Sequence, residues 1–121
     1  MARLKLKIQL YCGDEIAMGP GKADLLDAIA REGSISAAGR ALGMSYRRAW
    51  LLVDTMNRCF RTPLVETHPG GGQAAGAKLT AEGESALGAY RALSEQVEHG
   101  VPGASFETLE TAIRRAPLTR E

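Results

Sequence analysis

Residues Gly43–Phe60 read GMSYRRAWLLVDTMNRCF, and this stretch decides the fold of the chain. Apolar residues recur along it with the spacing of one helix face, at Ala49, Leu52, Val53, Met56 and Phe60. The pattern predicts a long helix capped by Ser45, with Gly43 in a left-handed turn before it. Arg47 and Arg48 then stand in the first helical turn. They are either ordinary solvated charges or the leading edge of a helix that inserts into a polyanion.

Two helices are predicted immediately before this one. Leu25, Leu26 and Ile29 form an apolar stripe in a helix from residue 22 to residue 31, which stops at Gly33. Ser34 is the predicted N-cap of a short helix with the sequence ISAAGRAL. The small residues of this short helix let it cross the long helix closely; they are Ala37, Ala38, Gly39 and Ala41.

Strands are predicted on both sides of the helices. Residues 4–11 alternate between apolar and polar, which predicts a half-buried strand, and the glycine-rich residues 12–22 form a connection. Residues 64–67 and 77–80 are predicted to pair as a hairpin around a glycine-rich tip.

The C-terminal third is predicted to form two more helices. Thr80 caps a helix over residues 81–98, in which Ala86, Tyr90, Leu93 and Val97 are spaced as in a seam between two helices. A last helix begins at Ser105, with apolar residues at 106, 109 and 113.

The net charge is +1, but the charges are segregated along the chain. Residues 40–61 contain five arginines and one aspartate, a local charge of +4, whereas residues 81–110 contain six glutamates and one arginine, a local charge of −5. Such segregation indicates a basic face for a polyanion, although chance clustering of charges is the alternative.

Composition and spacing exclude several classes of protein. Cys12 and Cys59 lack the spacing of zinc ligands, and no nucleophile has a base within plausible reach, so we expect no metal site, no cofactor and no enzyme. No segment of these 121 residues resembles a signal peptide, and no apolar run approaches membrane-spanning length. We therefore expect a cytoplasmic protein with reduced thiols.

The predicted order of elements is that of a winged helix-turn-helix, a mainly α fold with small β-sheets (α+β). The first turn of its recognition helix enters the major groove of DNA, where one bidentate arginine–guanine pair is worth roughly 1–3 kcal/mol of discrimination. The predicted contacts with double-stranded DNA are Ser34, Ser36, Ser45, Tyr46, Arg47, Arg48 and Lys78. Ser34 and Ser36 are in the first place caps, and Trp50 is assigned to the core or its rim rather than to a base contact.

Four segments carry a resemblance to a known family: GSISAAGRALGMSYRRAW, VDTMN, PLVET and GGGQAAGAKLTAEGE. Together they resemble the N-terminal domain of ModE-type molybdate-responsive transcription regulators and, more distantly, the LysR-type winged helix. The resemblance extends from about residue 4 to residue 97 and implies a DNA-binding and dimerising module. The oxyanion-binding domains of full-length ModE proteins have no counterpart in these 121 residues, so we do not expect molybdate binding.

The sequence thus predicts a homodimeric DNA-binding transcription regulator. Residues 1–80 form the winged helix-turn-helix, and residues 81–121 form a dimerisation helix and a short C-terminal helix. The predicted dimer contacts are Leu87, Tyr90, Leu93 and Val97. Two alternatives stay open: a winged-helix docking module for another protein, and a regulator with an effector site at the dimer interface.

Overall fold

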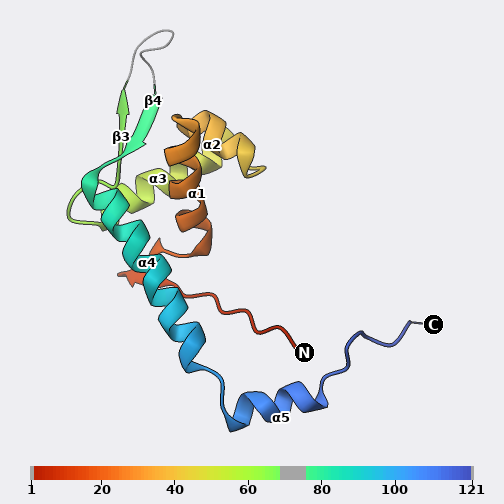
Figure 1. The fold of residues 1–121 in the computed structure, drawn as a ribbon. Helices are drawn as coiled ribbons and strands as arrows, with labels where there is room; N and C mark the ends of the chain where they lie inside the picture. The colour runs from red at the N-terminus through yellow and green to blue at the C-terminus, as the bar shows by residue number, and fades with distance from the viewer. Residues whose placement is uncertain (1, 69–75, 121) are drawn as a thin grey trace.

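The structure, a computed structural model, describes residues 2–68 and 76–120. Its elements are β1 (Leu10–Cys12), β2 (Glu15–Met18), α1 (Pro20–Glu32), α2 (Ile35–Ala41), α3 (Tyr46–Cys59), β3 (Val65–His68), β4 (Gly76–Leu79), α4 (Ala81–Gly100) and α5 (Ala104–Ala112). Helices α1, α2 and α3 form a compact group, beside which β3 and β4 project as a hairpin (Figure 1). The tip that we predicted to be glycine-rich lies outside the described residues.

The hydrophobic core lies where α1, α2 and α3 meet. Leu25, Leu26 and Ile29 of α1 are fully buried there, together with Val53 and Met56 of α3. The predicted helix is confirmed, but it begins two residues earlier because Pro20 occupies its first turn. Proline is favoured at that position, since its missing N–H would lack a partner in the helix anyway.

The turn between α2 and α3 has the predicted geometry. Gly43 has a φ of 72°, a left-handed conformation that glycine adopts without steric cost. A Cβ atom added at Gly39 would lie 3.2 Å from Cβ of Ala49, so the two helices cross with almost no space between them. Ala38 and Gly39 are buried at this crossing, whereas Ala41 is exposed and has no part in it.

Strands β3 and β4 form an antiparallel hairpin in which Val65 pairs with Leu79 and His68 with Gly76. Each strand is shifted by one residue from its predicted range. The N–H of Ala77 donates to the carbonyl oxygen of Gly33 at 2.8 Å, which fastens the hairpin to the end of α1. This backbone hydrogen bond therefore helps to hold the hairpin against α1.

The predicted strand over residues 4–11 is largely wrong. Only Leu10 and Tyr11 of that range belong to a strand, and the residues after them, predicted as a connection, supply its partner β2. Because β2 has only four residues, it cannot pair with the rest of the alternating segment. Ile8 in that segment packs against the core without a strand partner.

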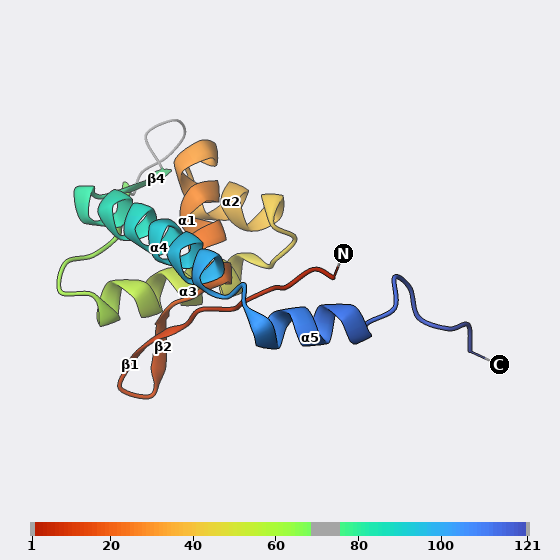
Figure 2. The same cartoon turned by 60° about the horizontal axis from the view of Figure 1, so that its bottom comes forward.

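Helix α4 starts at the Thr80 cap, as predicted, and runs past α1 (Figures 1 and 2). Tyr90 is buried, and its hydroxyl donates to the carbonyl oxygen of Ile8 at 2.7 Å. Arg91 forms salt bridges with Asp24 at 3.0 Å and with Asp27 at 2.7 Å, both on α1. The first half of α4 is therefore attached to the winged helix, whereas the second half extends beyond it.

Helix α5 lies apart from the three-helix group and buries none of its residues (Figure 2). It begins at Ala104 after the cap residue Gly103, which corrects the predicted start at Ser105. In the part of the chain that the structure describes, no helix is long and apolar enough to cross a membrane.

Candidate nucleic-acid interface

The first turn of α3 is exposed and carries the predicted basic residues. Oγ of Ser45 accepts from the N–H of Arg48 at 3.1 Å, so this serine is an N-cap, as predicted. Tyr46, Arg47 and Arg48 are all exposed. Among the described residues, no salt bridge involves Arg47 or Arg48. Both guanidinium groups are therefore available to an external anion.

The two arginines lie on different sides of α3, because successive helical residues are about 100° apart. Arg48 is close enough to Lys22, at the beginning of α1, for the two positive charges to repel each other. Burial lowers the pKa of the Lys22 ammonium. Cys59 and Glu15 oppose this shift, and the positive charge of Arg48 adds to it. Lys22 is a neighbour that sequence reasoning missed, since nothing local relates residue 22 to residue 48.

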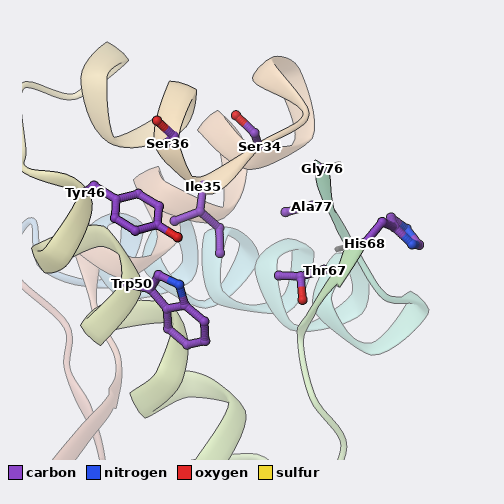
Figure 3. A pocket seen from close by; sticks show the side chains of 9 residues that line it. All are labelled: Ser34, Ile35, Ser36, Tyr46, Trp50, Thr67, His68, Gly76 and Ala77. Atoms are coloured by element: carbon purple, nitrogen blue, oxygen red, sulfur yellow. The ribbon is translucent and has the colours of Figure 1, made fainter. Parts of the chain in front are cut away.

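The two serines of α2 make hydrogen bonds within the chain. Oγ of Ser34 accepts from the N–H of Ala37 at 3.0 Å, which confirms the predicted cap. Oγ of Ser36 accepts from Nη1 of Arg40 at 2.9 Å. Both serines also line a hollow of about 280 Å³ between α2, α3 and the hairpin (Figure 3). Their hydroxyls thus lie beside the predicted DNA-binding surface.

Aromatic and hairpin residues complete this hollow. Tyr46 and Trp50 of α3 lie on one side, and Thr67, His68 and Ala77 of the hairpin lie on the other (Figure 3). Trp50 is 41% exposed, which places it at the rim of the core rather than inside it. The hollow connects α3 to the β3–β4 hairpin in one concave surface, with hydroxyl, imidazole and aromatic groups around it.

Lys78 projects from β4, but its charge has a partner. Its Nζ atom lies 3.3 Å from Oε1 of Glu66 on the facing strand, and His68 lies 4.0 Å from the same oxygen. The wing is therefore less basic in its described part than Lys78 alone suggests. The pair is exposed, so solvent screens it strongly.

Arg58 is also engaged, although it belongs to the basic stretch of the sequence. It contacts Glu15 through both terminal guanidinium nitrogens at 2.9 Å and donates to Asp54 at 3.0 Å. The hydrogen bond from Arg58, together with its charge, lowers the pKa of Glu15, and the two carboxylates raise the pKa of Arg58. Arg58 thus joins α3 to β2 instead of extending the free basic surface.

Cys12 and Cys59 are far apart in the sequence but lie near each other in the structure. Burial and the neighbouring Cys12 thiol raise the pKa of the Cys59 thiol, which favours its protonated form at neutral pH. Over residues 2–68 and 76–120, no three histidine, cysteine or acidic side chains are grouped as a metal site would need.

The four predicted dimer residues fall into two groups. Tyr90 belongs to the core of its own chain, and Leu87 is half-buried against that core. Leu93 is half-buried and Val97 is exposed in the second half of α4. The contact between Tyr90 and Ile8 therefore makes Tyr90 an internal anchor, whereas Leu93 and Val97 stay accessible.

Known proteins with similar sequences include regulators and molybdenum-related proteins. The chain is 46% identical over 80 residues to the molybdenum-pterin-binding protein MopB of Rhodobacter capsulatus, which covers 66% of this chain and 30% of that protein. It is 43% identical over 77 residues to the molybdenum transport protein ModE of Azotobacter vinelandii (64% and 28%). It is 35% identical over 92 residues to the DNA-binding transcriptional dual regulator ModE of Escherichia coli K12 (76% and 34%). The chain thus spans about a third or less of the length of these relatives.

A solved structure supports the fold assignment. The crystal structure of a CbnR_DBD–DNA complex superposes with a TM-score of 0.53 at 21% identity, over 78% of this chain and 97% of that one. This likeness confirms the predicted winged helix-turn-helix with its α+β architecture. Residues 22–84 match the sequence model of the family described as bacterial regulatory helix-turn-helix protein, lysR family. Because this match covers more than half of the 121 residues, the chain belongs to the LysR-type family of bacterial regulatory helix-turn-helix proteins.

Proposed function

We propose that this chain is a sequence-specific DNA-binding transcription regulator and not an enzyme. The observation that carries the proposal is the exposed first turn of α3, where Arg47 and Arg48 have no salt-bridge partner among the described residues. A recognition helix enters the major groove with this turn first. Arg47 then reaches base edges, while Arg48, Lys22 and the serines of α2 face the phosphates beside the groove.

We further propose that the regulator acts as a homodimer formed through α4. This helix has 20 residues and is about 30 Å long, but only Gly83 and Tyr90 are buried in it. Its second half exposes Val97, and α5 beyond it exposes Leu109 and Ile113. In proteins most helical stability comes from packing of an apolar face, so a second copy of the chain is the occupant that we infer for this exposed part. Two α3 helices would then contact successive major-groove faces of a pseudo-palindromic site.

We also propose a division of roles along the chain. Residues 1–80 are the proposed DNA-binding unit, and residues 81–121 are the proposed dimerisation unit, the first half of which packs on the DNA-binding unit. The acidic character of residues 81–110 fits this division, because glutamates repel phosphates and keep that part of the protein away from DNA.

The experiment that tests the proposal is selection of bound sequences from random duplex DNA with the purified protein, with and without molybdate. We expect an enriched motif with two-fold symmetry. Absence of any enriched motif would contradict sequence-specific binding and would favour the docking module. An asymmetric motif bound by a single chain would contradict the proposed dimer but not sequence-specific binding.

Molybdate is included because relatives of this chain are named as molybdenum proteins. We expect unchanged affinity, since the resemblance covers the DNA-binding region and not the oxyanion-binding domains. Affinity that changes with molybdate would instead place an oxyanion site within these 121 residues.

A further inference from the structure

The outward face of α3 is more apolar than a solvated helix face needs to be. Tyr46 is 54% exposed, Trp50 41% and Leu51 52%, and none of them belongs to the buried core. Large apolar side chains that gather on an exposed face indicate a contact surface. These three side chains are on the same helix as Arg47, so they would lie close to DNA in the proposed complex.

The helix geometry arranges these side chains around Arg47. Leu51 lies one turn after Arg47, on the side of α3 opposite the buried residues Ala49 and Val53. Trp50 borders the hollow shared with the wing, and it also borders a second hollow of about 380 Å³ that is lined by Tyr46, Arg47, Leu51 and Asp54. Figure 3 shows the Tyr46 and Trp50 rings standing next to each other on the wing side of the helix. The Trp50 side chain therefore forms a ridge between the two hollows.

The charges around this ridge suit a polyanion. Arg47 brings a positive charge to the second hollow, and the only carboxylate that lines it belongs to Asp54. That carboxylate accepts from Nε of Arg58 at 3.0 Å, which offsets its negative charge. A major groove can therefore approach this face without an uncompensated repulsion from its phosphates.

Only one base in double-stranded DNA offers an apolar group to the major groove, namely thymine through its 5-methyl. We propose that Trp50 and Leu51 read thymine methyl groups, so that each half-site contains thymine next to the base contacted by Arg47. The inference rests on the proposed function and names a specificity element within it. It also explains why an otherwise basic helix carries exposed apolar side chains.

The test uses the operator found by selection, with each thymine replaced in turn by deoxyuridine. This change removes one methyl group and keeps every hydrogen-bonding group of the base. Burying one methyl-sized group contributes about fourfold in affinity. We expect a loss of about fourfold at one or two positions per half-site when affinity is measured by fluorescence anisotropy at fixed salt.

Two variants test whether Trp50 and Leu51 cause the loss of affinity on deoxyuridine replacement, which we call the deoxyuridine penalty. In Trp50→Ala and in Leu51→Ala, the deoxyuridine penalty should disappear at the position that each side chain contacts. Arg48→Ala is the matched control, because it should weaken binding and keep the full penalty. Leu51 is half exposed and outside the core, so Leu51→Ala keeps the inference testable even if Trp50→Ala folds poorly.

Trp50 provides a second readout because it is the single tryptophan of the chain. On binding of the operator, we expect its fluorescence to become less accessible to acrylamide than on binding of a random duplex of equal length. Equal accessibility in the two complexes would place Trp50 outside the specific contact.

The outcomes separate this inference from the proposed function. Specific binding without any deoxyuridine penalty, or with a penalty that both alanine variants retain, overturns the methyl contact and leaves the regulator intact. Failure to select any sequence overturns both. DNA binding unchanged by Trp50→Ala and Leu51→Ala would also overturn the methyl contact.

Discussion

At the scale of single residues, the arginines of the basic stretch have different environments. Arg47 and Arg48 are exposed at the start of α3, whereas Arg58 is held by Glu15 and Asp54. Arg40 donates to Ser36 within α2. The surface that is free to meet a polyanion is therefore smaller than the count of arginines in the sequence implies.

The different positions of Arg47 and Arg48 lead to different expected effects. Arg47→Ala should relax the sequence preference at one base pair per half-site, because it removes a base contact worth about 1–3 kcal/mol. Arg48→Ala should weaken binding to all sequences and reduce the salt dependence by roughly one counterion per subunit. Titration of operator and random duplexes at several salt concentrations measures both effects.

Arg115→Ala is the matched control, since it removes the same charge from an exposed position beyond α5. Replacement of both Arg47 and Arg48 by alanine should abolish specific binding and leave the fold and the dimer intact. An unchanged sequence preference in that double variant would contradict the assignment of α3 as the recognition helix.

At the scale of elements, one polar side chain joins the recognition helix to the wing. Oδ1 of Asn57 accepts from the N–H groups of Leu64 at 2.9 Å and Val65 at 3.2 Å, and Nδ2 donates to the carbonyl oxygen of Val65 at 3.0 Å. Three backbone groups that enter β3 thus find their partners on α3. The spacing of apolar residues indicates that residue 57 is off the core stripe, but it does not indicate this role.

Replacement of Asn57 by alanine should lower the free energy of unfolding by about 2–3 kcal/mol, because partly buried backbone groups lose their partners. Asn57→Asp should cost less, since its carboxylate still accepts from both N–H groups. Thr55→Ala is the control, because Thr55 makes only an exposed hydrogen bond to the carbonyl of Leu51 in the same helix. Urea denaturation measures all three variants, and a stable Asn57→Ala protein would contradict the bridging role.

At the scale of the whole molecule, the two ends of α4 are packed differently. Its first half is anchored to the winged helix by Tyr90 and Arg91, and its second half extends away from it. This division places the proposed dimer contact at Leu93, Val97 and α5, at a distance from the DNA-binding surface. Tyr90 is therefore removed from the predicted dimer contacts, because it is buried against its own chain.

Leu93→Glu should convert the proposed dimer to a monomer, because a charge would be buried at the seam without a partner. Operator affinity should fall with it, as each subunit would then bind one half-site alone. Ala92→Glu adds the same charge on an exposed side of α4 and should leave the dimer intact. Sedimentation velocity distinguishes the two variants, and a monomeric wild type would contradict the dimer.

The local pattern of the sequence was sufficient for the existence of the helices, the caps at Ser34, Ser45 and Thr80, the Gly43 turn and the exposed basic start of α3. These features depend on residues within three or four positions of one another, and local spacing reports such contacts directly. Only the tertiary structure decided that residues 4–9 form no strand, that Tyr90 contacts Ile8 across 82 residues and that Arg58 contacts Glu15 across 43. The same holds for the exposed ridge of Trp50 between two hollows. These outcomes depend on which surfaces meet when the chain packs, and a one-dimensional pattern does not contain that information.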